Sequence, residues 1–581
     1  MKKKEQKMKK KQNGLWIGLT LTSVVALMLC DSLSKTPQIL PQSDMVIVRH
    51  DAPTVLTPII LEQNKYGDYL AGMMAQRNQD YDQTILSFRQ ALADDPNNEK
   101  LKVTLYLLNA VGGHIDQSLP LAKELQYINK PELMIDYVLI ADALNRKDYT
   151  SAEQILNQKR HYGPDGVLKP ALSAWILAAQ GKRAEAEKAL SALKNQQSKS
   201  LYHYYRALLA LIFSDSNAAE SAFKEMSMAS EQGYPSLSVL PILRQFYQKQ
   251  KAWQDGQADY NRITSFLEKN LPVKDIINNI QLPDKMTPEM AAAISFYDVS
   301  VALSSLKLTE TCLILNEIAL YLYPDANIPK VWGGELMETA QNYQGANRIY
   351  DRIPIQSDVI LMKKAVNLTA SEKYSDAIVL FEQLAQRVPQ DAYLHILLGD
   401  AYTQVKDWEK AATAYQKAAI LFQQQKNKEK ESEALFALGA AYDKMSQTEK
   451  SEKAFLDSIK ANPNNSLSLN YLGYLWLDKR KNIDEAFNMV KRAADLLPDD
   501  PNIMDSLALG YYLKQDYQTA LELAEKSTDL ISYSSVAYAH LGDIYNALGR
   551  KREARYQYRK ALDLTSDITP ELKAELEQKL K

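Results

Sequence analysis

The sequence predicts an all-α protein, a solenoid built from paired helices, and three observations support this. In the C-terminal half, a Leu-Gly or Leu-Ala pair returns with the same small and aromatic companions at fixed distances. A period of about 34 residues made of two short amphipathic helices is typical of a repeat array rather than a globule. No strand pattern of any length is evident. The 581 residues include only 22 Pro and 20 Gly, with 46% apolar and 24% charged residues, as expected for well-packed helices.

The residue types explain why the period holds. In the repeat that starts near Leu398, Gly399 of the first helix and Ala411 of the second are small enough for the two helices to approach closely. Tyr402 and Tyr415 are large enough to fill the space that remains. The same spacing returns at Leu438-Gly439, Leu472-Gly473, Leu507-Ala508 and Leu541-Gly542. Each pair of helices still has an apolar face that only a neighbouring pair can cover, so the pairs must stack.

This pattern resembles the tetratricopeptide repeat family, most strongly from about residue 360 to residue 565. Gly72, Phe88 and Ala91 fit the same pattern upstream, and we expect roughly 14 repeats in all. The resemblance implies a right-handed superhelical solenoid. It also implies that the first helix of each repeat lines the inner surface, where partners bind.

Residues 1–33 are predicted to be a signal peptide or signal anchor. Seven lysines within residues 2–11 precede an apolar run from Leu15 to Cys30. This order is typical of a secretory signal or membrane anchor whose lysines stay in the cytoplasm. The repeats should therefore lie outside the cytoplasm, in the cell envelope, either anchored to the membrane or periplasmic.

Three fates of this segment stay open. Cys30 resembles the lipidated cysteine of bacterial lipoproteins and is a candidate for lipidation. Cleavage could instead follow a small-x-small site such as Ser32-Leu33-Ser34, or the segment could be kept as an anchor. Residues 34–62, with four prolines, are predicted to form an extended linker.

The rest of the chain is predicted to form two arrays and a cap. Residues 63–268 should be a degenerate N-terminal array, and residues 291–567 a C-terminal array. Between them, residues 269–290 hold three prolines without a helical apolar period, which indicates a joint or loop. Thr569-Pro570-Glu571 is a helix-start signal, so residues 568–581 should form a capping helix. A polar insertion at residues 423–431 should lengthen one connection.

Several classes of site are not recognisable. The net charge of −2 argues against a nucleic-acid partner. The six histidines are scattered and form no metal-ligand spacing, so neither a metal nor a cofactor is predicted. Gly181-Lys182 ends like a phosphate-binding loop, but Ile176 stands where that loop needs glycine, and a turn between helices is predicted instead. Cys312 occupies the alanine position of a second helix, which indicates a buried side chain rather than a nucleophile. No catalytic residue is predicted.

The resemblance places the partner-binding site on the inner surface of the C-terminal array. Counting from the start of each repeat, the candidate partner-binding residues are Tyr393, Asp400, Asn470, Tyr474, Asp478, Asp505, Tyr512 and Asp543. Acids and aromatics dominate, and such a surface suits a protein or peptide with basic residues. Some members of the family clamp a C-terminal carboxylate with basic residues and asparagine. The corresponding positions here include Phe436, Tyr471 and His540, so a chaperone-adaptor role is disfavoured.

A narrower resemblance covers residues 469–500, 505–512 and 540–564. These segments are similar to long repeat proteins of alphaproteobacteria that are mostly exported or envelope-associated. The sequence therefore predicts a non-enzymatic, envelope-associated repeat scaffold that binds proteins or peptides and contacts the membrane through its N-terminal segment. Two alternatives stay open. One is an enzyme or peptidoglycan-directed protein with a site hidden in residues 200–330, and the other is a soluble cytoplasmic adaptor.

Overall fold

The computed structural model describes residues 67–77, 81–127, 134–158, 165–195, 199–229, 237–249, 261, 283–306, 308–354, 356–565 and 568–581. Over these ranges the regular structure is helical and no strand is present, which confirms the all-α prediction. None of the helices described is both long enough and apolar enough to cross a bilayer. The predicted signal or anchor, the linker and Cys30 lie outside these ranges, as does most of the predicted joint. The superhelical hand and the number of repeats stay predictions.

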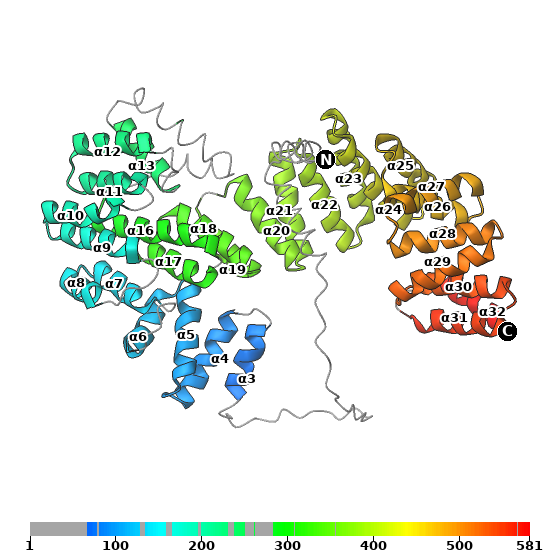
Figure 1. Cartoon of the computed structure of the whole chain (residues 1–581), viewed down its shortest axis with the longest axis horizontal. Helices are drawn as coiled ribbons and strands as arrows, with labels where there is room; N and C mark the ends of the chain where they lie inside the picture. The colour runs from blue at the N-terminus through cyan, green and yellow to red at the C-terminus, as the bar shows by residue number, and fades with distance from the viewer. Residues whose placement is uncertain are drawn as a thin grey trace, which may run out of the picture. The chain divides into compact units, whose positions relative to one another are not determined.

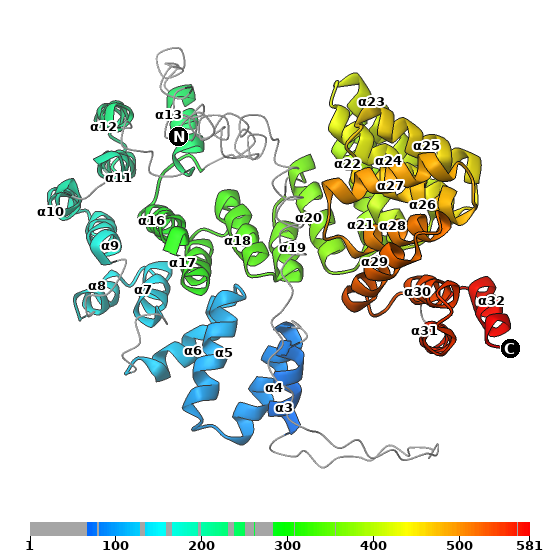
Figure 2. The ribbon, with the colours of Figure 1, turned by 45° about the vertical axis from the view of Figure 1, so that its right-hand side comes forward.

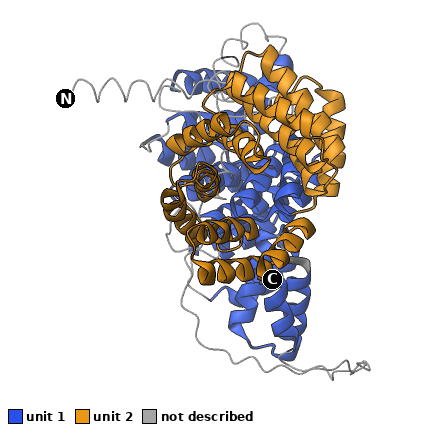
Figure 3. Ribbon diagram, turned by 90° about the vertical axis from the view of Figure 1, so that its right-hand side faces the viewer, with its two compact units in different colours: residues 1–371 blue, residues 372–581 orange. Residues whose placement is uncertain are grey.

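The chain folds as two compact units, Met1–Ser371 and Glu372–Lys581, coloured separately in Figure 3. In both units the helices follow one another as antiparallel pairs joined by short turns (Figure 1). The contacts therefore divide the chain after Ser371, whereas the sequence pattern is interrupted at residues 269–290. Of that interrupted stretch, the described part ends in a helix that begins at Pro288 and is capped by the Thr287 hydroxyl, which accepts the Met290 N–H.

The helices of unit 1 are α3 (Gly67–Arg77), α4 (Tyr81–Asp94), α5 (Glu99–Val111), α6 (Ile115–Leu125), α7 (Ile135–Asn145), α8 (Tyr149–Gln158), α9 (Asp165–Ala179), α10 (Arg183–Leu190), η2 (Ser191–Asn195), α11 (Lys199–Ile212), α12 (Ser216–Met228), α13 (Val239–Lys249), α16 (Pro288–Leu303), η4 (Ser304–Leu306), α17 (Thr309–Leu322), α18 (Asn327–Thr339), α19 (Tyr343–Asp351) and α20 (Asp358–Ala370). Gly181 lies between α9 and α10 with a φ of 78°, a left-handed conformation that suits glycine. The predicted turn at Gly181-Lys182 is thus confirmed.

The helices of unit 2 are α21 (Tyr374–Arg387), α22 (Ala392–Gln404), α23 (Trp408–Gln424), α24 (Lys428–Lys444), α25 (Thr448–Ala461), α26 (Ser466–Asp478), α27 (Ile483–Leu496), α28 (Pro501–Leu513), α29 (Tyr517–Leu530), α30 (Ser535–Ala547), α31 (Lys551–Asp563) and α32 (Pro570–Leu580). The sequence predicts that the polar insertion at 423–431 lengthens a connection, and this prediction is wrong. Most of it is helical, because α23 and α24 each run to 17 residues while α22 has 13 and α25 has 14.

A close contact between glycine and an aromatic ring joins the helices of several pairs. A Cβ atom built on Gly399 would lie 2.5 Å from the Tyr415 ring, and one on Gly542 would lie 2.4 Å from the Tyr558 ring. Real side-chain atoms do not approach so closely, so a larger residue could not sit there without moving the ring. The complementarity of small and large residues predicted from the sequence is therefore seen in the packing.

The inner face of unit 1 is covered by the chain itself. Helices α16 and α17 pack against the first helices α5, α7, α9 and α11 of the preceding pairs, and Figure 2 shows them beside α7 and α9. The Trp175 indole of α9 donates a hydrogen bond of 3.0 Å to the Ser295 hydroxyl of α16. The rings of Tyr137 and Phe296 meet edge to face, with centroids 5.6 Å apart. Trp175, Tyr137 and Phe296 are fully buried.

A single hydrophobic core results, running from Tyr106 to Ile360. Cys312 of α17 lies inside it, fully buried, and burial raises the pKa of its thiol to about 11. The prediction that Cys312 is a packing residue is confirmed. In this unit α5, α7, α9 and α11 are therefore in contact with α16 or α17 of the same chain.

Candidate partner-binding surface

Three first helices of unit 2, α26, α28 and α30, pack side by side and carry most of the candidate residues. Their order follows from the stacking of repeats, in which each first helix lies against the next. Asn470, Tyr474 and Asp478 lie on α26, Asp505 and Tyr512 on α28, and Asp543 on α30. These residues thus lie on neighbouring helices, but their burial and their hydrogen-bond partners differ.

Asp505 and His540 form a buried ion pair between α28 and α30. The His540 Nδ1 atom lies 3.0 Å from Oδ2 and 3.2 Å from Oδ1 of Asp505, whose exposed fraction is only 7%. The Tyr474 ring of α26 lies beside the His540 ring, with centroids 6.2 Å apart. Asp505 therefore holds two first helices together instead of facing solvent.

This pair makes the stability of unit 2 depend on pH. Burial alone would lower the pKa of His540, but the charge and hydrogen bond of Asp505, with Asp543 and Asp478 nearby, raise it above its ordinary value of 6.5. A pKa that is higher in the folded chain gives stability that is complete below the unfolded pKa and lost as pH rises through the folded pKa. We expect the unfolding free energy of the wild type to exceed that of His540→Gln by a margin that shrinks as pH rises above about 6.5. Urea titrations at several pH values measure this, and a difference that stays constant or grows would contradict the assignment.

Asp400 and Asp543 each accept a hydrogen bond from a tyrosine of the second helix of their own repeat. The Tyr415 hydroxyl donates to Asp400 and the Tyr558 hydroxyl donates to Asp543, both at 2.7 Å. Each tyrosine stands 15 residues after its aspartate, and its ring packs on the preceding glycine. Where the ring belongs to Phe455, which has no hydroxyl to donate, the residue after Gly439 is Ala440, which has no carboxylate to accept. These two aspartates therefore have a role in repeat packing.

The capping helix also engages Asp543. The Lys579 ammonium of α32 lies 2.7 and 2.8 Å from the two carboxylate oxygens of Asp543. The cap stays in place through Leu576, which is fully buried, with Leu572 and Leu580 packed beside it as the sequence stripe predicts. A partner that approached Asp543 would have to displace a lysine of the chain itself.

Two candidate tyrosines take part in ring packing. The half-buried Tyr393 ring meets Phe422 edge to face, with centroids 5.0 Å apart. The Tyr512 ring, also half-buried, lies 5.8 Å from Tyr517 between centroids. Tyr393 therefore lies on α22 with Asp400, apart from the candidates on α26, α28 and α30, and Tyr512 lies near the C-terminal end of α28.

The candidates on α26 remain available to a partner. Asn470, Tyr474 and Asp478 stand four residues apart and so lie along one face of the helix. The Asn470 Oδ1 atom is buried without a hydrogen-bond partner among the described residues. Within the same part of the chain the Tyr474 hydroxyl has no hydrogen bond and the exposed Asp478 carboxylate has no ion pair. Burial and the charges of Asp478 and Asp505 raise the pKa of Tyr474, so it remains a neutral donor. We call these three residues the α26 stripe.

The sequence did not reveal two partners of this surface. The sequence pattern identifies His540 only as a position where a basic clamp is absent, and it does not indicate that the Tyr471 hydroxyl donates to Asp443 at 3.0 Å. The repeated 15-residue interval from aspartate to tyrosine is a signal that could have shown that Asp400 and Asp543 have partners. Among the residues that the structure describes, no group of histidine, cysteine, aspartate and glutamate side chains could hold a metal ion.

Comparisons with known proteins agree with the repeat pattern. Tetratricopeptide repeat models match residues 390–464 and 535–568, so the chain carries tetratricopeptide repeats. A crystal structure of the APC/C hetero-tetramer Cut9-Hcn1 matches 90% of this chain and 97% of that chain, with 14% identity and a TM-score of 0.35.

Two curated relatives share part of the sequence. Anaphase-promoting complex subunit 3 of Schizosaccharomyces pombe is 22% identical over 205 residues, which are 35% of this chain and 30% of the relative. Protein O-mannosyl-transferase TMTC1 of Homo sapiens is 27% identical over 187 residues, or 32% of this chain and 20% of the relative. The chain therefore spans less than a third of the length of each relative. A tetratricopeptide repeat fold is typical of non-enzymatic proteins that mediate contacts between proteins.

Proposed function

We propose that this tetratricopeptide-repeat chain is a non-enzymatic scaffold of the cell envelope that binds a basic segment of a partner protein along the α26 stripe. The observation that carries the proposal is the set of unused polar groups on α26. Among the described residues the exposed Asp478 carboxylate has no ion pair, so a lysine or arginine of a partner can pair with it from solvent.

The surroundings of the stripe favour a cationic partner. Asp478 can form a charge-assisted hydrogen bond, and Tyr474 offers a rigid apolar face beside it. Asp443 and Asp505 lie near enough to influence Tyr474 electrostatically. The surface of α26 therefore combines an aromatic anchor with negative charge.

Fluorescence anisotropy of labelled lysine- and arginine-rich peptides with the full chain tests the proposal. We expect Tyr474→Ala with Asp478→Asn to weaken binding at least about tenfold, because a truncated aromatic anchor commonly costs more than 1.4 kcal/mol. Tyr474→Ala with Tyr512→Ala should also weaken it, and the size of the extra loss measures what Tyr512 adds.

The matched control is Tyr556→Ala, which removes a tyrosine that is 63% exposed on α31. It should leave the affinity unchanged. The assignment to α26 is wrong if the double variant keeps its helical content and still binds every peptide as tightly as the wild type. Binding should also weaken as salt is raised, since the contact is partly ionic.

The envelope location rests on the lysine-rich start, on the apolar run that follows it and on the likeness to exported alphaproteobacterial repeat proteins. A C-terminal tag in intact cells should react with a reagent that cannot cross the cytoplasmic membrane. A tag that reacts only after the cytoplasm is opened would place the repeats inside and favour a soluble adaptor.

A further inference from the structure

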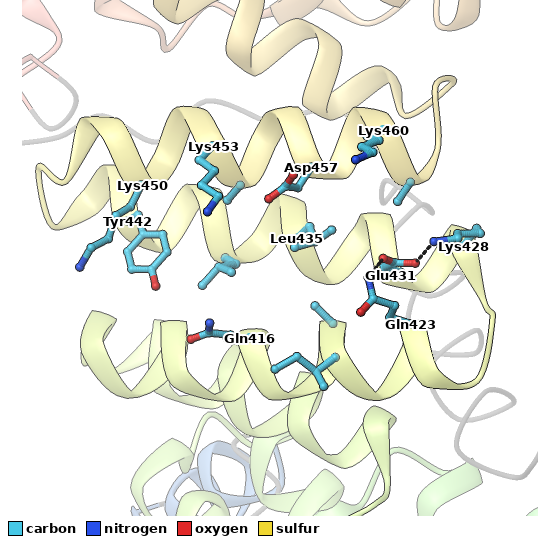
Figure 4. Close-up of a pocket in the computed structure, with 15 residues that line it drawn as sticks. Gln416, Gln423, Lys428, Glu431, Leu435, Tyr442, Lys450, Lys453, Asp457 and Lys460 are labelled. Atoms are coloured by element: carbon cyan, nitrogen blue, oxygen red, sulfur yellow. Dashed lines mark hydrogen bonds and ion pairs between the residues drawn. The ribbon is translucent and has the colours of Figure 1, made fainter.

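A cleft lies on unit 2, apart from the α26 stripe. It runs between the second helices α23 and α25, with the first helix α24 at its base, and its volume is about 600 Å³ (Figure 4). Small side chains such as Ala419, Ala454 and Ala461 line it, so the neighbouring helices do not fill it. The additional length of α23 and α24 extends the cleft along both helices. We call it the outer-helix cleft.

The charges in the outer-helix cleft are mainly positive. Lys450, Lys453 and Lys460 follow one another along α25, exposed and without an ion pair to any described residue. Lys450 lies over the Tyr442 ring at 5.4 Å, which keeps its ammonium group at the edge of the cleft. Asp457 is the acidic residue of this row.

The other carboxylate of the cleft is neutralised by its neighbours. Glu431 is 5% exposed and accepts hydrogen bonds from Lys428 at 2.7 Å and from Gln423 at 3.0 Å. Figure 4 shows this group at one end of the cleft, with the lysine row of α25 along its side. Four lysines thus stand against two carboxylates, and the free ammonium groups belong to α25.

The base of the cleft is apolar. Leu435 is half-buried, Leu438 is nearly buried, and Ile420 on α23 keeps 44% of its surface exposed. Exposed apolar surface beside unpaired charge of one sign is typical of a surface that binds an amphipathic segment. A small anion would use the lysines and leave Leu435 and Ile420 in water. A flat lipid surface could not reach Leu435 between two helices.

The spacing of the lysines fits a helix. The ten steps from Lys450 to Lys460 cover about 15 Å along α25, or nearly three turns. A partner helix with acidic residues at intervals of three and seven positions would present one carboxylate to each lysine and none to Asp457. We propose that the outer-helix cleft docks an acidic amphipathic helix of a partner protein, with its apolar side on Ile420 and Leu435 and its carboxylates on Lys450, Lys453 and Lys460.

A synthetic peptide helix with one acidic and one leucine-rich face is the probe, and binding to the full chain is measured by anisotropy. We expect Lys453→Glu with Lys460→Glu to weaken binding at least about tenfold, because two attractive pairs become repulsive. Ile420→Asp should weaken it as well, since the apolar contact is lost from an already exposed position. Neither site contributes a buried core side chain, so thermal unfolding should stay near that of the wild type.

The matched control is Lys491→Glu with Lys573→Glu, which makes the same change of charge at exposed lysines outside the cleft. Equal weakening in the control would mean that only net charge matters and would overturn the proposal. Equal binding of a scrambled peptide of the same composition would also overturn it. So would a Lys453→Glu, Lys460→Glu variant that binds vesicles of anionic lipid more weakly but binds the peptide as tightly as the wild type. Tyr474→Ala with Asp478→Asn should leave this binding unchanged, which separates the outer-helix cleft from the proposed use of α26.

Discussion

Phe296→Ala is expected to lower the free energy of unfolding of unit 1 by about 3–5 kcal/mol, the usual cost of removing a fully buried phenylalanine side chain. Phe296 lies on α16 and packs edge to face on Tyr137 of α7, so its loss leaves a cavity between two parts of the chain that are distant in sequence. The effect should be larger than that of a cavity within one helix pair, because no local shift of a pair can close it.

Urea unfolding followed by circular dichroism, together with hydrogen exchange, measures this effect. Amides of α5, α7 and α9 should exchange faster, while those of unit 2 should not change. Leu306→Ala is the matched control, since Leu306 follows α16 and is 62% exposed, and it should change stability by less than about 0.5 kcal/mol. Unchanged exchange in α7 would mean that α16 does not hold the inner face of unit 1.

Gly542→Val is expected to destabilise the last repeats of unit 2 by about 2 kcal/mol or more. A Cβ atom at this position would lie 2.4 Å from the Tyr558 ring, so the ring must move and its hydrogen bond to Asp543 must break. Asn546→Val puts the same β-branched residue at an exposed position of the same helix and should cost much less.

Thermal unfolding and hydrogen exchange of α30 and α31 measure this second effect. Combining Gly542→Val with Tyr558→Ala should cost less than the sum of the two single changes, because removing the ring makes room for the valine. Simple additivity would show that the glycine and the ring are not coupled.

The repeat could be predicted from the sequence because the contacts that produce it lie within one pair of helices. Gly399 and Tyr415 stand at a fixed distance in one pair of helices, and their contact depends on little else. The same holds for the stripe of Leu572, Leu576 and Leu580 on the capping helix. Residues that contact neighbours close in the sequence produce a periodic sequence pattern, and that pattern predicted the fold.

Contacts between segments that are distant in the sequence produce no such periodic pattern. The hydrogen bond between Trp175 and Ser295 joins residues 120 positions apart, and nothing in the period predicts it. The pair of Asp505 and His540 also crosses from one repeat to the next, so counting within a repeat could place Asp505 on the inner face but could not show that it was paired. Side chains of the chain itself engage Asp400, Asp505 and Asp543, whereas no described side chain hydrogen-bonds or pairs with Asn470 Oδ1, the Tyr474 hydroxyl or the Asp478 carboxylate.

The covered face of unit 1 also has a consequence for how the chain is made. The hydrogen bond of Tyr149 to Glu289 can form only after 140 more residues are synthesised, and that between Tyr321 and Asp142 only after 179 more. At about 5–20 residues per second, a ribosome needs roughly 7–36 s to supply those segments. During that interval α7 and α9 present tryptophan and tyrosine rings that the finished protein hides. The packing of unit 1 can therefore be completed only after α16 and α17 have been synthesised, whereas each repeat of unit 2 can pack on the next as it emerges.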